Sequence, residues 1–316
     1  MTTSPPPSPH PDSRKGGLTA PPCLRRATTA ALVVSVVIVA TGGAARLNDS
    51  GLGCPTWPTC TGESLNATAR AGWRGIIELG NHLLTYVLAT AVGWVILAAR
   101  HAERGRRDVL LLGWGQFAVI VAGALLGGVT AFTGLTPYAV VGHFLLSTAL
   151  ITLACLTRSR TALPPAPAAA ASAPSRTPAR TLPTTGILLT AWGTAVTGLH
   201  AGPWGTMPHL SVDWATATRM HSVLGWTVLA LALLLHLHRH RTRAPGWIVG
   251  RTRLLLAALA GQGALRYAQS TLGVPEQPFA LPLLGSCLTA IAVLHATVHL
   301  TRAPGPPTGG KGGAEA

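Results

Sequence analysis

Eight long apolar runs dominate this sequence of 316 residues. Each run approaches the roughly 20 residues that an α-helix needs to cross the hydrocarbon core of a bilayer. Only 10% of the residues are charged, and a soluble domain of this composition would lack a polar surface. The runs are 27–47, 75–99, 109–129, 137–157, 184–202, 217–237, 254–270 and 279–300. The sequence therefore predicts an all-α membrane protein with eight transmembrane helices.

The basic residues are concentrated in alternate loops. Nineteen of the 24 lysines and arginines lie in the two terminal segments and in segments 100–107, 158–180 and 239–253. Because cytoplasmic loops carry the excess of positive charge, both termini are expected in the cytoplasm. This topology explains the formal net charge of +15, so no nucleic-acid partner is expected. The excess of arginine over lysine is typical of a GC-rich bacterial genome, which indicates a bacterial plasma membrane.

The chain is expected to divide into two halves. Segment 158–183 is rich in proline, alanine and serine and has no helical periodicity, which predicts a flexible cytoplasmic linker. It separates an N-terminal four-helix half, 27–157, from a C-terminal four-helix half, 184–301. The tails, 1–26 and 302–316, are poor in residues that form a core and are predicted to be disordered.

Similar residues recur in the two halves. Asn81-His82 of the second run lies against His221-Ser222 of the sixth, so each half has a histidine here if a one-residue shift is allowed. A glycine precedes the fourth and the eighth run, and nine residues beyond it stands His143 in the first half but Pro282 in the second. The sequence therefore predicts two pseudo-repeated four-helix bundles in which one histidine is missing from the second.

Ionisable residues inside the apolar runs are the candidate functional groups, because burying them in a bilayer is costly. Glu78 either pairs with Arg74 at the outer interface or acts as a general acid/base, and it shares one helix face with His82. His143 and His221 lie near the outer ends of their runs. Each either hydrogen-bonds to a neighbouring helix or ligates a metal, and a haem between helices would explain their recurrence.

Two cysteines, Cys54 and Cys60, flank Pro-Thr-Trp-Pro-Thr in the first outer loop. This side of a bacterial membrane is oxidising, so a disulfide is expected, with a redox-active thiol pair as the alternative. A zinc site is disfavoured because no partnering cysteine or histidine pair follows.

Several segments resemble the haem A synthases of the cytochrome oxidase assembly group, in particular their actinobacterial branch. The most specific is TGGAARLNDSGLGCPTWPTC, which is similar to the family's first-span exit and cysteine loop. The others are IIELGNHLLT, GGVTAFTGLTPYAVVGHFLL, GTAVTGLHAG and QGALRYAQSTLGVPEQPFALPLLGS. These segments are distributed over nearly the whole of the expected membrane domain.

The resemblance implies an enzyme that oxidises the C8 methyl of haem O to the formyl group of haem A. It implies haem b as cofactor, haem O as substrate, and haem O synthase and cytochrome oxidase as candidate partners. Glu78 takes the place of the family's essential glutamate, and Cys54 and Cys60 that of its disulfide. His143 and His221 take the places of iron ligands.

Two positions depart from the family's pattern. The family's histidine-arginine pair is replaced by Asn81 and His82, so His82 is either a shifted iron ligand or a substitute for the arginine. Pro282 stands at the eighth-span ligand position, and proline cannot bind iron. The alternative hypothesis is therefore a non-catalytic haem-binding paralogue that acts in oxidase assembly. A transporter is disfavoured because the runs contain one acidic residue and no broken-helix pair.

Overall fold

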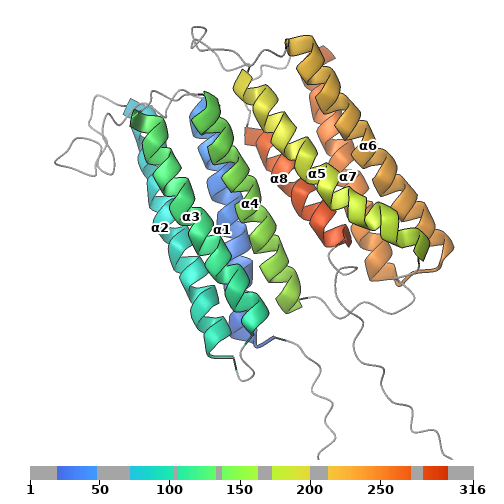
Figure 1. Cartoon of the computed structure of the whole chain (residues 1–316), viewed down its shortest axis with the longest axis horizontal. Coiled ribbons are helices and arrows are strands. Elements are labelled where there is room, and N and C mark those ends of the chain that lie inside the picture. The colour runs from blue at the N-terminus through green and yellow to red at the C-terminus, as the bar shows by residue number, and fades with distance from the viewer. Residues whose placement is uncertain are drawn as a thin grey trace, which may run out of the picture.

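The computed structural model of the chain describes residues 20–47, 72–102, 106–132, 137–162, 173–199, 213–271 and 280–297. Every regular element within these residues is an α-helix, which confirms the all-α prediction (Figure 1). The helices are α1 (Pro22–Leu47), α2 (Gly72–Arg100), α3 (Arg107–Phe132), α4 (Pro137–Ala162), α5 (Ala173–Leu199), α6 (Trp214–Arg241), α7 (Gly246–Thr271) and α8 (Ala280–Thr297).

The helices form two bundles that lie side by side, α1 to α4 and α5 to α8 (Figure 1). Helices adjacent in sequence pack against each other within each bundle, and α1 also packs against α4. Each bundle has its own apolar core, around Leu88 and Val92 in the first and around Val228 and Leu235 in the second. The bundles meet where α8 contacts α1 and α4 and where α4 contacts α5.

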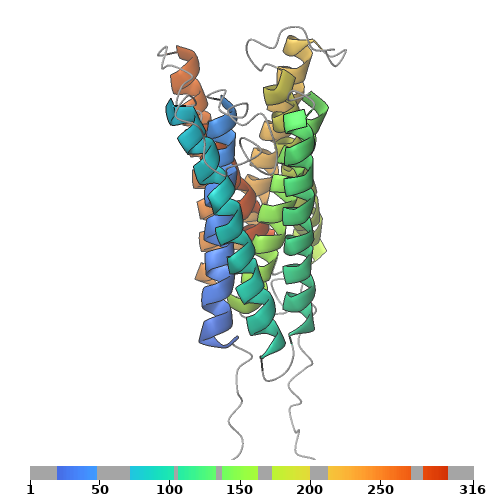
Figure 2. The same ribbon diagram turned by 90° about the vertical axis from the view of Figure 1, so that its left-hand side faces the viewer.

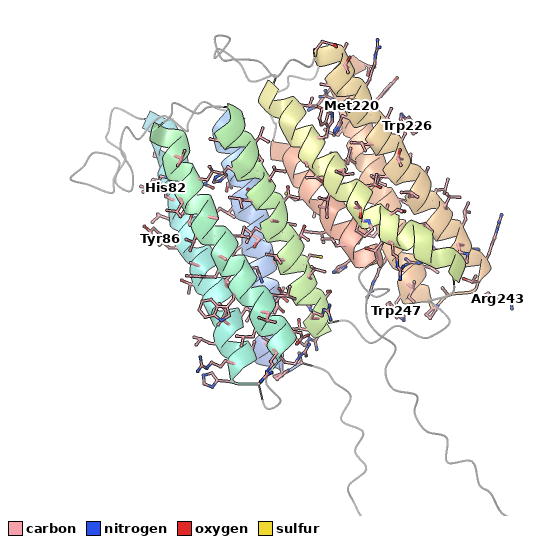
Figure 3. All side chains as sticks on the ribbon, viewed as in Figure 1. His82, Tyr86, Met220, Trp226, Arg243 and Trp247 are labelled. Atoms are coloured by element: carbon pink, nitrogen blue, oxygen red, sulfur yellow. The ribbon has the colours of Figure 1, made fainter. Side chains whose placement is uncertain are left out.

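Large apolar side chains face outward from these bundles. Leu111 is 73% exposed and Trp226 is 72% exposed, and Figure 3 shows Trp226 on the outer side of α6. In water such a surface would be unfavourable, whereas in a bilayer it faces lipid chains of the same polarity. The outward residues therefore fit a protein that is surrounded by lipid.

Five helices are long and apolar enough to cross a membrane: α1, α2, α3, α4 and α6. The chain is thus a multi-pass membrane protein, and five of the eight predicted spans are supported. Helix α7 is less apolar because it contains Arg251, Arg253 and Arg266. The polar first half of α5 contains Pro178 and Pro183, and the apolar part of α8, Gly285–Thr297, is short.

The helices extend into both ends of the segment that was predicted as a linker without helical structure. Helix α4 continues to Ala162, and α5 begins at Ala173. Arginine is a good helix former, so Arg158 and Arg160 continue α4 where hydrophobic periodicity gives no signal. The predicted tail 302–316 and residues 1–19 of the other tail lie outside the described residues. Residues 22–26, which were predicted to be disordered, form the start of α1, where Leu24 is buried in the core of the first bundle.

The two ends of the molecule differ in charge. One end holds the start of α1, the end of α4, the start of α5 and the end of α8, together with the α2–α3 and α6–α7 connections (Figures 1 and 2). These are the arginine-rich segments, and this end is called the basic end below. The candidate histidines of α2, α4 and α6 lie towards the opposite end, which is called the site end.

Candidate functional site

His221 is the most enclosed of the candidate ligands. Its Nδ1 is buried and has no hydrogen-bond partner among the described residues. The imidazole packs against Gly193 of α5, where an added Cβ would lie only 2.7 Å from its Cε1. The side chain thus has a nitrogen available for a ligand bond and occupies a space that only a glycine leaves open.

Helix α5 holds the start of α6 in place beside this histidine. The Trp192 indole donates a hydrogen bond of 2.9 Å to the carbonyl oxygen of Ala217, one helical turn before His221. Asp213 caps α6 by accepting from the Thr216 amide at 2.9 Å. The Thr216 hydroxyl and amide also hold the pKa of the Asp213 carboxyl below its usual value. The backbone that carries His221 is therefore fixed from two sides.

His143 lies in the second turn of α4, facing α3. An added Cβ on Gly127 would lie 3.8 Å from its Cε1, which is an ordinary contact distance. The imidazole itself is exposed in the chain alone. His143 is therefore less confined than His221, and there is open space beside it.

Asn81 occupies the position on α2 that corresponds to His221 on α6. Its Oδ1 accepts a hydrogen bond of 2.9 Å from the Thr41 hydroxyl of α1. An added Cβ on Gly42 would lie 3.4 Å from its Nδ2, so the amide packs closely against α1. Asn81 therefore joins the first two helices of its half, as His221 and Gly193 bring together the first two helices of the other.

The buried faces of α2 and α6 establish the register between the two halves. The matching buried pairs are Leu88 and Val228, Val92 and Ala232, Val95 and Leu235, and Ala99 and Arg239. Each pair is separated by 140 residues, and the same separation joins Asn81 to His221. The one-residue shift that would pair His82 with His221 is therefore not present in the structure.

His82 lies on the outward face of α2. Its side chain is exposed, and Figure 3 shows it with Tyr86 along the edge of the N-terminal half. A step of one residue turns a side chain by about 100° around a helix, which separates His82 from the face of Asn81. Within the described residues no contact joins His82 to His143.

A second register relates α3 and α4 to α7 and α8. Matching buried pairs again keep a constant separation, here 139 residues: Gln116 and Leu255, Leu150 and Thr289, Ala154 and Val293, and Cys155 and Leu294. The same step leads from His143 to Pro282 and from Gly127 to Arg266. In the C-terminal half, both the histidine and the glycine beside it are thus replaced.

Arg266 adds a charge to the C-terminal half. It lies close enough to His221 for a direct electrostatic interaction. The sequence motifs did not single out Arg266 or Gly193, because their roles depend on neighbours from other helices. The internal repeat could have indicated them, if the comparison of the two halves had been extended from the histidines to the residues that pack against the histidines.

The remaining predicted site residues are less fully described. Glu78 lies on α2, one turn before His82, and Pro282 lies in the first turn of α8, but only their backbones are described. Cys54 and Cys60 lie outside the described residues. Among the residues that are described, no three histidine, cysteine or carboxylate side chains gather into a metal site.

Residues 25–86 match the family described as cytochrome oxidase assembly protein. The resemblance is confirmed over this stretch. The matched segment of the family spans α1, the loop with Cys54 and Cys60, and the part of α2 with Glu78 and His82. No curated protein matches the chain.

Proposed function

We propose that the protein is a haem A synthase-like membrane oxidoreductase that converts the C8 methyl of haem O to a formyl group. The observation that carries this proposal is the match of residues 25–86 to the cytochrome oxidase assembly family. The buried, partnerless Nδ1 of His221 supports it, because a buried imidazole nitrogen is costly unless it binds something.

The residues present fit a haem held by one histidine in each half. In the C-terminal half His221 would hold the iron, and in the N-terminal half His143 would. The positions opposite them carry Asn81 and Pro282, so the described residues do not fit two histidines on each iron. A bound haem b would supply iron-based oxidation with O₂ as the oxidant, and haem O would be the substrate.

The proposal gives Glu78 the role of a general acid/base or of a group that orients the substrate. His82 is four residues further along the same helix, so the two positions lie on one face of α2. For His82 the proposal includes two roles that experiment separates: an iron ligand of the N-terminal half, or a partner of Glu78. The register between α2 and α6 favours the second role.

In the proposed topology all eight helices span the membrane. Both termini are cytoplasmic, so the site end faces outward and the basic end faces the cytoplasm. This places the Cys54–Cys60 loop on the oxidising side, where the two thiols would form a disulfide. Haem O synthase and cytochrome oxidase are the proposed partners.

The second candidate function is a non-catalytic haem-binding paralogue that acts in oxidase assembly. The observation that favours it is the absence of a second histidine at Asn81 and at Pro282, because a protein that only carries haem needs fewer iron ligands. The two candidates share the haem site and differ in turnover.

One expression experiment tests both functions. In a host that makes haem O and lacks its own synthase, the purified full chain should contain haem b and the membranes should contain haem A. Haem binding without haem A favours the paralogue, and the absence of any haem contradicts both functions. Extracted haems are separated by chromatography and quantified per polypeptide.

Variants then assign the roles. Glu78→Gln should keep the haem content but abolish haem A, because it removes the proton-transferring group while leaving the iron ligands intact. His143→Ala should lower the Soret absorbance of the purified protein by about half, since one of two haem-binding histidines is lost. A Glu78→Gln variant that makes haem A at the parental rate would exclude a chemical role for the glutamate.

A further inference from the structure

Three arginines and one histidine approach one another at the basic end, where helices of both halves meet. They are Arg158 of α4, Arg239 of α6, Arg251 of α7 and His295 of α8, and they are called the cation cluster below. Helix α8 contacts both α4 and α7, which brings the residues of the two halves together (Figure 1).

Hydrogen bonds and ring contacts hold this cluster in place. Arg239 is only 4% exposed, and its Nη2 donates to the Ala296 carbonyl at the end of α8 over 2.8 Å. The Arg251 guanidinium carbon lies 4.5 Å from the centre of the Trp247 ring. The cluster is therefore part of the packed structure and not a set of freely moving surface side chains.

The arginines of the cluster repel the positive charges beside them. His295 interacts electrostatically with both Arg251 and Arg158, and Arg239 interacts with Arg251. Arg25 of α1 adds a further positive charge beside Arg158. The Nη1 of Arg158 is buried and has no hydrogen-bond acceptor among the described residues. The Nη1 donor of Arg158 thus lacks an acceptor and lies among other positive charges.

The described carboxylates do not neutralise this charge. Asp108 is held by Arg106 at 3.1 Å, and Asp213 caps α6 near the site end. The end of α8 offers only the partial negative charge of a helix C-terminus, about half an elementary charge. No described carboxylate pairs with Arg158, so its buried Nη1 is the donor that an added anion would satisfy.

We propose that the cation cluster binds the phosphate of an anionic phospholipid of the cytoplasmic leaflet, which then bridges the two halves. Basic sites between transmembrane helices on the cytoplasmic side are suited to phospholipid headgroups. The guanidinium fork matches the geometry of phosphate oxygens, and half-buried Arg158 and Arg251 leave access from the lipid. This proposal rests on the topology and is independent of haem chemistry.

Lipid binding to the full chain tests the proposal directly. Delipidated protein is titrated with phosphatidylglycerol, phosphatidylcholine or inorganic phosphate, and bound lipid is counted by native mass spectrometry. The parent should prefer phosphatidylglycerol, and Arg158→Gln with Arg251→Gln should weaken that binding about 25-fold, at roughly fivefold per arginine. The matched control, Arg241→Gln with Arg243→Gln, changes the same charge at exposed positions of the same end (Figure 3).

Three results would overturn the proposal. In the first, the cluster variant and the control lose the same amount of phosphatidylglycerol binding. In the second, inorganic phosphate saturates the site and displaces the lipid. In the third, the parent binds phosphatidylcholine as tightly as phosphatidylglycerol. The paired substitutions Arg158→Lys and Arg251→Lys should restore most of the binding, because they restore the charge.

A stability measurement covers the case in which the cluster variant binds nothing because it is unfolded. In neutral detergent Arg158→Gln should raise the melting temperature, since it removes a repelling charge. Phosphatidylglycerol should then raise the melting temperature of the parent by more than that of the variant. A variant that melts below the parent in neutral detergent and gains as much from the lipid would contradict the proposal.

Discussion

At the scale of single residues, a candidate ligand depends on the small residue beside it. The imidazole of His221 occupies the space above Gly193, whereas Gly127 leaves His143 an ordinary contact distance. Whether a histidine in an apolar helix is a candidate ligand is usually decided from its position in the sequence. Here the glycine on the neighbouring helix determines whether the ring fits at all.

Substituting Gly193 by alanine should therefore damage the C-terminal site. The new Cβ would lie 2.7 Å from His221 Cε1, so the ring or the helix must move. Overpacking of this kind costs about 1–3 kcal/mol. The haem content of the purified protein should fall by about half, measured by Soret absorbance per polypeptide.

Gly225→Ala is the control, because no atom lies within 4 Å of the position of its added Cβ. Alanine favours a helix by about 1 kcal/mol over glycine, so this control should retain its haem and its stability. Equal haem loss in both variants would show that the effect belongs to glycine in general and not to the His221 site.

At the scale of helices, the register between the repeats decides which side chains correspond. The buried residues of α2 and α6 keep one constant separation, and this separation pairs His221 with Asn81. The side-chain oxygen of Asn81 accepts a hydrogen bond from Thr41, which joins α1 and α2. The corresponding position of the second half is His221 of α6, which packs against α5. At the corresponding ligand positions each half thus retains one histidine, His143 of α4 in the first and His221 of α6 in the second.

Asn81→His should accordingly add a second ligand to the N-terminal haem. The expected result is a six-coordinate, low-spin signature in the absorption and paramagnetic resonance spectra, with some loss of stability because the Thr41 hydrogen bond is removed. Such interhelical hydrogen bonds contribute about 0.6 kcal/mol in a membrane.

His82→Ala provides the opposite test of the register. Because His82 faces outward, the haem content of this variant should stay at the parental level. Loss of the N-terminal haem in His82→Ala, with an unchanged spectrum in Asn81→His, would show that His82 is the ligand and that α2 turns when haem binds.

At the scale of the whole molecule, the two halves are separate bundles joined by contacts of α8 and α4. Each bundle has its own core, and α8 packs against α1 and α4 of the other half. The Cys155 thiol approaches the Ile291 carbonyl at 4.0 Å across this boundary. Packing contacts therefore join the halves in addition to the connecting segment.

Co-expression of residues 1–162 and 173–316 as separate chains should therefore yield a complex. A tag on one chain should capture the other in a mild detergent, and the complex should bind haem as the intact protein does. The C-terminal chain should not be captured by an N-terminal chain that lacks α4, because α4 contacts both α5 and α8. Recovery of the two chains singly would show that segment 163–172 is needed for association.

The sequence alone was sufficient to predict the helices and their apolar character. Apolar length predicted eight helices, because each segment must satisfy its backbone hydrogen bonds within the bilayer. Helices α5 and α7 begin well before their predicted starts at residues 184 and 254. The repeat also predicted that His143 corresponds to Pro282. These are local properties, and each follows from the residues of a single segment.

The tertiary structure decided which residues meet. Rotation of α2 separates Asn81 from His82, and only the packing against Thr41 and Gly42 shows which of them faces the bundle. The confinement of His221 and the cation cluster likewise depend on side chains from different helices. The sequence determines where a residue lies along its helix, whereas the packing of the helices determines which side chains it contacts.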